Sequence, residues 1–116
     1  MQITPRVLFT VAGVAFAMIV LWPGSGRDAV AEARAVVGAD RVVLFSAQWC
    51  GYCDRLRDEL TRARVDFTEH DIEQSAGSHD AWQALGGRGV PVTLVDSVVV
   101  HGFDPGRILT LARAAP

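Results

Sequence analysis

The stretch 42-VVLFSAQWCGYCDRL-56 brings an apolar run, a short turn and the only two cysteines of the chain, Cys50 and Cys53, into direct succession. The run at residues 42–45 predicts a buried strand, and residues 54–63 have the pattern of a helix. We therefore expect both sulfurs at a helix N-terminus, where backbone N–H groups and the helix dipole favour a thiolate over a thiol. A thiolate beside a second thiol at this spacing indicates a thiol–disulfide exchanger.

The two cysteines are expected to have different roles. Cys50 precedes the helix, where its sulfur can stay accessible, and is the candidate nucleophile. Cys53 lies one turn further on, is more shielded, and would attack the mixed disulfide that Cys50 forms. Structural cysteines or a zinc site are the alternatives, but zinc needs two more ligands. The three histidines, His70, His79 and His101, show no paired ligand spacing, so we predict no metal ligands.

The N-terminal quarter of the chain differs in kind from the rest. Residues 7–22 carry no charge and no polar face, which favours a single-pass transmembrane helix over a buried core helix. A cleaved signal peptide is the alternative, because residues 31–33 (Ala-Glu-Ala) resemble a cleavage site. We therefore divide the chain into an anchor and linker at residues 1–27 and a redox domain at residues 28–116.

The charged residues bear on the partner and on the orientation in a membrane. The net charge is −2, all eleven basic residues are arginine, and no basic block suggests a nucleic-acid partner. Arg6 and the terminal amine favour an N-terminus on the inside, whereas Arg27, Arg34 and Arg41 on the other flank oppose that orientation. We expect a membrane protein whose redox domain is extracytoplasmic and which acts as a monomer.

The pattern after the anchor predicts an α/β domain. Its expected elements are a helix at 28–37 capped by Asp28, a strand at 41–46, a helix at 54–63, a strand at 65–69, a short helix capped by Ser78, strands at 92–95 and 98–101, and a helix at 104–114. Strand–helix–strand units imply parallel pairing, and the late hairpin adds an antiparallel edge. We predict a central mixed four-stranded sheet flanked by helices.

Val90 and Pro91 form the second informative segment, just before a predicted strand and after a glycine-rich turn. Beside a cysteine pair, we predict a cis Val90–Pro91 bond. It would bring the Val90 backbone beside Cys50 and offer an extended edge to a peptide or a small thiol. A trans proline that opens an edge strand is the alternative. An inert anchored domain that docks partners through this edge is also open.

Other candidate binding residues lie around the two cysteines in the predicted fold. Trp49 and Tyr52 frame the thiol, to shape substrate access or to cover the edge of the core. The N–H groups of Gly102 and Phe103 open the last helix and are candidates for binding a carboxylate. Asp104 is a candidate for contacting an amine, and a plain helix cap is compatible with both.

Four segments together resemble the glutaredoxin family of the thioredoxin-like fold. They are FSAQWCGYCDRLRDEL, FTEHDIE, GVPVTLV and HGFDPGRIL, and the resemblance covers about residues 41–114. It implies a dithiol reductase that is reduced by glutathione or another low-molecular-weight thiol, with Pro91 cis and the Val90 backbone binding the thiol. Its substrates would be protein disulfides or mixed disulfides of small thiols, and no cofactor would be bound.

Departures from the family pattern concern the electron donor. Ala47 stands where many relatives have a lysine for a glutathione carboxylate, and His101 stands where Gly-Gly is usual before the last helix. The GFDP segment resembles glutaredoxin-like hydrogen donors that are reduced by thioredoxin reductase, and WCGYC also occurs in mycoredoxins, which use mycothiol. Gly51 replaces the common proline, as in some relatives that bind a [2Fe–2S] cluster between two subunits. A cluster- or metal-binding module is therefore the alternative function.

Overall fold

Strand β1 (Val42–Ser46) lies inside the sheet, and all five of its residues are buried. The computed structural model of the protein describes residues 26–115. The other elements are α2 (Gly26–Val37), α3 (Gly51–Arg62), β2 (Thr68–Asp71), α4 (Ala76–Ala84), β3 (Val92–Val95), β4 (Val98–His101) and α5 (Pro105–Arg113). The strand order β2-β1-β3-β4 confirms a mixed four-stranded sheet. Strand β1 pairs in parallel with β2 and antiparallel with β3, and β3 pairs antiparallel with β4.

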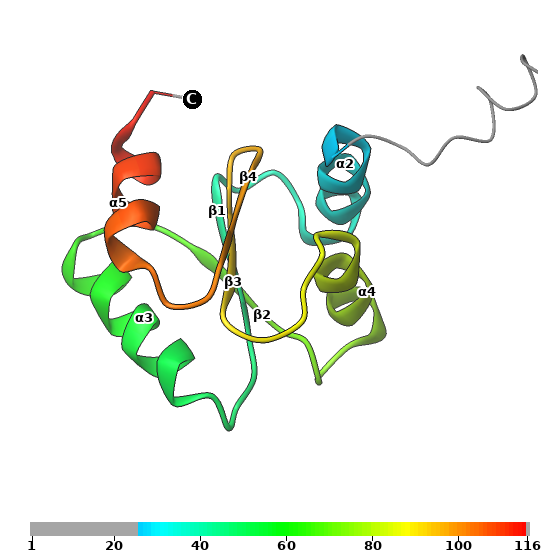
Figure 1. The fold of residues 1–116 in the computed structure, drawn as a ribbon, viewed down its shortest axis with the longest axis horizontal. Helices are drawn as coiled ribbons and strands as arrows, with labels where there is room; N and C mark the ends of the chain where they lie inside the picture. Colours follow the sequence, from blue (N-terminus) through cyan, green and yellow to red (C-terminus); the bar gives the residue numbers. More distant parts are fainter. Residues whose placement is uncertain (1–25, 116) are drawn as a thin grey trace, which may run out of the picture.

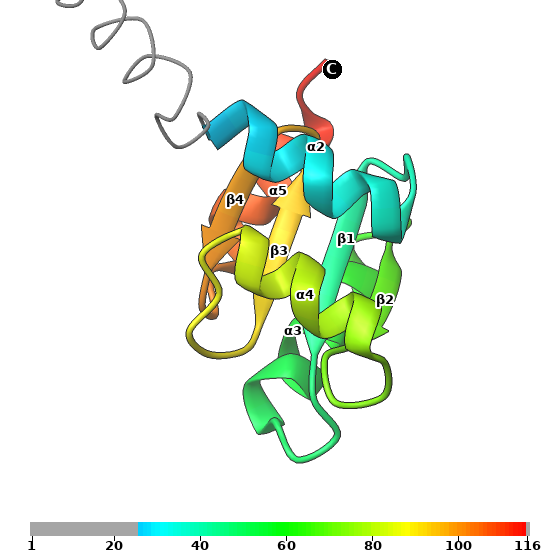
Figure 2. The same ribbon diagram turned by 90° about the vertical axis from the view of Figure 1, so that its right-hand side faces the viewer.

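Helices cover both faces of the sheet, with α2 and α4 on one side and α3 and α5 on the other (Figures 1 and 2). Successive β1 side chains alternate between the faces. Val43 and Phe45 pack in the cluster that includes α2 and α4 residues. Leu44 packs in the other cluster, with Leu56 of α3 and Ile108 of α5. The continuous apolar run in β1 is thus the consequence of two covered faces.

Several element boundaries differ from the sequence prediction. Helix α2 begins before Asp28, so this residue lies in the first turn and is not the cap. Helix α3 begins at Gly51 because the side chain of the preceding cysteine caps it. Strand β2 starts at Thr68, three residues later than predicted. Ser75, not Ser78, caps α4, since its side chain accepts a hydrogen bond from the Ser78 N–H at 3.0 Å.

The predicted membrane segment lies outside the described residues. Within residues 26–115, no helix has the length and apolar character needed to cross a bilayer.

Two arginines connect several elements at the end of the sheet where β1 begins. Arg41 donates to both carboxylate oxygens of Asp96 at 3.0 and 2.9 Å, and to the carbonyl oxygens of Ala112 and Ala114 at the end of α5. Arg34 of α2 donates to the Asp96 carbonyl oxygen at 2.8 Å. These bonds connect the β3–β4 turn with both helical layers.

The Arg41–Asp96 contact predicts a pH effect on stability. The hydrogen bonds from Arg41 lower the pKa of Asp96 in the folded state. The contribution of the ionised Asp96 to the unfolding free energy is therefore fully present above the pKa of about 3.9 that an aspartate has in the unfolded chain. It is lost as the pH falls through the lower pKa of Asp96 in the folded protein. We expect Asp96→Asn to be less stable than the wild type in urea at pH 7, with a smaller difference at pH 3. A difference that does not change with pH would contradict this assignment.

Candidate active site

The end of β1 and the start of α3 position the two cysteines. Cys50 is the N-cap of α3, with extended backbone angles, and Cys53 lies in the first turn. The two sulfurs form a disulfide, with the Cα atoms 5.2 Å apart. The Cys50 sulfur also accepts a hydrogen bond from the Cys53 N–H, at 3.1 Å. The same N–H and the helix dipole would stabilise a thiolate on Cys50 after reduction.

The two sulfurs differ in exposure in the expected direction. Cys50 is 5% exposed and Cys53 is fully buried, so Cys50 is the residue that solvent or a substrate reaches first. It is more enclosed than the accessible sulfur that the sequence suggested, because Ala47 and Val90 pack against the pair. A thiolate on Cys50 would therefore lie between the apolar side chains of Ala47 and Val90 and the N-terminus of α3.

The Val90–Pro91 peptide bond is cis, as predicted. The Val90 side chain packs against the cysteine pair, which places the segment beside Cys50. The Pro91 carbonyl oxygen accepts a hydrogen bond from the Gly102 N–H at 2.9 Å. A cleft of about 360 Å³ follows this segment, and its lining includes Gly89, Val90, Pro91 and Gly102. The structure thus brings two distant segments, before β3 and after β4, to one end of the sheet.

Trp82 supports the turn that leads to Val90, a role that sequence reasoning missed. Its indole Nε1 donates to the Gly89 carbonyl oxygen at 3.0 Å, and its own carbonyl oxygen accepts from the Gly87 N–H at 2.9 Å. A Cβ atom at Gly87 would lie 2.3 Å from that Nε1. The four-residue glycine-rich stretch was the available signal, because a turn that approaches a ring this closely requires glycine.

Gly87→Ala is expected to displace Trp82 and the turn. The added methyl group overlaps the indole ring, and overpacking of this kind costs about 1–3 kcal/mol of unfolding free energy. The midpoint of urea unfolding should fall accordingly. Gly89→Ala is the matched control, since a Cβ there meets nothing within 4 Å. Equal stability of the two variants would show that Trp82 does not hold the turn.

Three exposed aromatic residues surround the disulfide. Trp49 is 70% exposed, yet its Nε1 donates to Glu73 Oε1 at 2.5 Å, which holds the ring in place. The rings of Tyr52 and Phe103 have centroids 5.6 Å apart. Arg55 lies over both, with its Cζ 5.9 Å from the Tyr52 centroid and 5.4 Å from that of Phe103. Phe103 thus reaches the cysteine helix from the loop before α5.

The start of α5 is a capped helix. Gly102 has a φ of 83°, which favours glycine. Asp104 is the N-cap, and its carboxylate accepts from the Arg107 N–H at 3.2 Å. The cap reading of Asp104 is therefore confirmed, and binding roles for Gly102 and Asp104 stay predictions.

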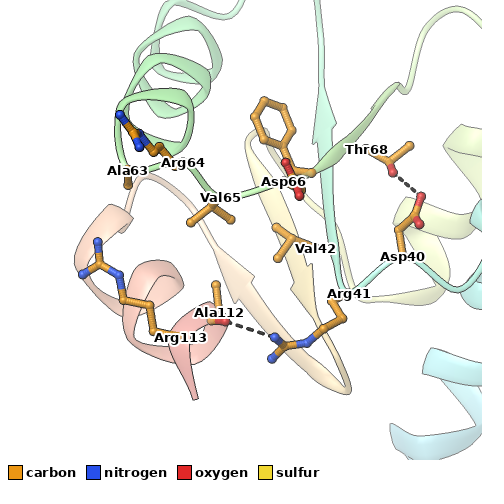
Figure 3. A pocket seen from close by; sticks show the side chains of 11 residues that line it. Asp40, Arg41, Val42, Ala63, Arg64, Val65, Asp66, Thr68, Ala112 and Arg113 are labelled. Carbon is orange, nitrogen blue, oxygen red and sulfur yellow. Dashed lines mark hydrogen bonds between the residues drawn. The ribbon is translucent and has the colours of Figure 1, made fainter. Parts of the chain in front are cut away.

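A larger cleft, of about 560 Å³, lies at the opposite end of the sheet (Figure 3). Its lining comes from the segment before β1, the connection after α3 and the end of α5, and includes Arg41, Val65 and Arg113. Both cysteines lie at the other end of β1, so this cleft is not the site of their chemistry.

No group of three or more metal-ligating side chains lies within residues 26–115. One copy of this part of the chain therefore offers no set of three such ligands to a metal.

Comparisons with known proteins agree with this geometry. The glutaredoxin family model matches residues 42–100, just over half of the chain. Glutaredoxin-C1 of Arabidopsis thaliana is 30% identical over 77 residues, 66% of this chain and 61% of the relative, so the chain spans less than two thirds of that protein. The Gene 56 protein of Mycobacterium phage L5 is 28% identical over 69 residues, 58% of this chain and 67% of the relative. The structure of a buckwheat glutaredoxin–glutathione complex matches with a TM-score of 0.59 and 21% identity, over 78% of this chain and 94% of that one.

Proposed function

Because the chain belongs to the glutaredoxin family, we propose that it is a thiol–disulfide oxidoreductase that reduces protein disulfides or mixed disulfides of small thiols through Cys50 and Cys53. One observation carries the proposal. The Cys50 sulfur caps a helix N-terminus, within bonding distance of a fully buried second sulfur.

The reaction proceeds by two exchanges. The Cys50 thiolate attacks one sulfur of the substrate disulfide, and the other substrate sulfur leaves as a thiolate that takes up a proton. Cys53 then loses its proton and attacks the Cys50 sulfur, which forms the Cys50–Cys53 disulfide and releases the second substrate thiol. Two electrons pass from the dithiol to the substrate. The cis Val90–Pro91 segment and the rings of Trp49, Tyr52 and Phe103 position the substrate.

An external reductant must restore the dithiol. We propose a low-molecular-weight thiol of the glutathione or mycothiol type, with thioredoxin reductase as the alternative donor. The apolar, buried Ala47 beside the cysteines offers no cation to a carboxylate at that position. The donor is therefore best identified by comparing the rate at which each candidate reduces the oxidised protein.

A single reaction of the reduced protein with a disulfide substrate tests the function. The reduced protein, mixed with an excess of a disulfide substrate, should end with the Cys50–Cys53 disulfide and an equal amount of reduced substrate, measured by mass spectrometry. A protein that reduces no disulfide would contradict the proposal. Visible absorbance of anaerobically purified protein tests the alternative, because a cluster absorbs there and a dithiol does not.

We also propose that residues 7–22 anchor the protein in a membrane, with the redox domain extracytoplasmic. The uncharged character of this run supports the anchor. Full-length protein should stay with membranes in alkaline carbonate, and protease added outside the membrane should digest the redox domain. Recovery in the soluble fraction of a chain that lacks its first residues would support a cleaved signal peptide instead.

A further inference from the structure

Exposed aromatic side chains are concentrated at the disulfide end of the domain. Only four large apolar residues within residues 26–115 are exposed, and three of them, Trp49, Tyr52 and Phe103, surround the cysteines. An exposed patch of rigid rings around a reactive group is typical of a surface that binds a partner. A small polar thiol has little apolar surface to cover three rings, whereas the side chains of a polypeptide do.

Arg55 supplies an uncompensated positive charge on this surface. It is exposed, and no acidic side chain within residues 26–115 lies within ion-pair distance of it. Its neighbour Arg57, in contrast, is held by Asp54 and Glu69, with separations of 2.8 and 2.6 Å. The guanidinium of Arg55 instead lies over two rings that hold it near the substrate path.

Two of the exposed rings have charged neighbours of opposite sign. Glu73 lies beside Trp49, to which it is hydrogen-bonded, and Arg55 lies beside Phe103. A carboxylate on the substrate would therefore be repelled on the Trp49 side and attracted on the Phe103 side. The surface thus has the means to orient an acidic substrate in one direction.

We propose that the surface formed by Tyr52, Arg55 and Phe103 binds an acidic side chain of a polypeptide substrate, close in sequence to the cysteine under attack. This inference rests on the proposed function and names its substrate class. Arg55 follows Cys50 by five residues, about 7.5 Å along a helix axis at ~1.5 Å per residue. An extended substrate advances ~3.3 Å per residue. The acidic residue is therefore expected about two positions from the substrate cysteine.

Single-turnover rates with matched peptides test the proposal. Reduced full-length protein is mixed with disulfide peptides that differ only in Glu, Gln or Lys two positions from the cysteine. We expect the Glu peptide to react about two- to fivefold faster than the Gln peptide, because an exposed charge pair contributes modestly. The Lys peptide should be slowest, and the preference should shrink at high salt.

Variants separate the role of Arg55 from general effects. Arg55→Gln should bring the ratio of the Glu-peptide rate to the Gln-peptide rate down to about one, and Arg55→Lys should restore the preference. Arg62→Gln, on the exposed face near the far end of α3, is the matched control and should behave as the wild type. An Arg55→Gln variant that slows all three peptides equally would overturn the inference.

The outcomes distinguish this inference from the proposed function. If the wild type reduces all peptides at one rate, the oxidoreductase function stands and the acidic-substrate surface is wrong. If it reduces none, the function itself fails. A mixed disulfide of glutathione with a neutral small thiol is assayed alongside the peptides. If Arg55→Gln slows the reduction of this small substrate and of none of the peptides, the surface binds a small thiol and the polypeptide inference is overturned.

Discussion

Cys50→Ser is expected to lower the rate of disulfide reduction by at least about a thousandfold, because a serine hydroxyl at neutral pH does not replace a thiolate nucleophile. The remaining Cys53 is fully buried, so it cannot reach a substrate in place of Cys50. To measure this loss, the reduced variant is mixed with a protein disulfide, and the rate of reduction is monitored through the free thiols that are released.

Cys53→Ser is the matched variant for the second exchange. It keeps the Cys50 nucleophile but lacks the thiol that releases the substrate, so it should stop at a mixed disulfide that survives in a non-reducing gel. Proteins captured in this way would identify both the substrate and its compartment. Capture by Cys50→Ser and none by Cys53→Ser would reverse the two roles.

Leu56→Ala is expected to cause a large loss of stability. Leu56 is fully buried on α3 and packs with Leu44 of β1 and Ile108 of α5. Replacement of a buried leucine by alanine removes apolar atoms that folding had taken out of water, and it leaves a cavity. Together these effects lower the unfolding free energy by about 2–5 kcal/mol. Urea unfolding of the variant measures the change in unfolding free energy.

Asp58→Ala provides the control on the same helix. Asp58 lies on the exposed face of α3, and a surface substitution of this kind changes stability by about 0.5 kcal/mol or less. A small effect of Leu56→Ala, similar to that of Asp58→Ala, would mean that α3 contributes little to the core.

The success of the sequence prediction depended on how local each signal was. The hairpin strands at Val92–Val95 and Val98–His101 were predicted with their observed bounds, because a continuous apolar run and a two-residue turn lie within ten residues. The start of α5 was predicted at Asp104 for the same reason, because a helix cap acts on neighbouring backbone.

Strand β2 shows where local signals were insufficient. Residues 65–69 alternate as a strand would, yet Val65 and Phe67 pack against the core from the connection after α3. The chain turns at Arg64, which has a φ of 57°, and the Val65 N–H donates to the Leu60 carbonyl oxygen at 3.0 Å. Pairing with β1 then begins only at Thr68, opposite Val43. Register depends on the partner strand, which no local pattern describes.

The amino-acid sequence by itself determined the reactive pair, the type of each element and the glutaredoxin-like order of motifs, because spacing, periodicity and caps act between near neighbours. Only the tertiary structure decided that β1 pairs antiparallel with β3, that Trp82 supports the turn before Val90, and that Phe103 meets Tyr52 and Arg55. These contacts join residues far apart in the chain. They form only where sheet register and packing of helices on both faces bring one end of the domain together.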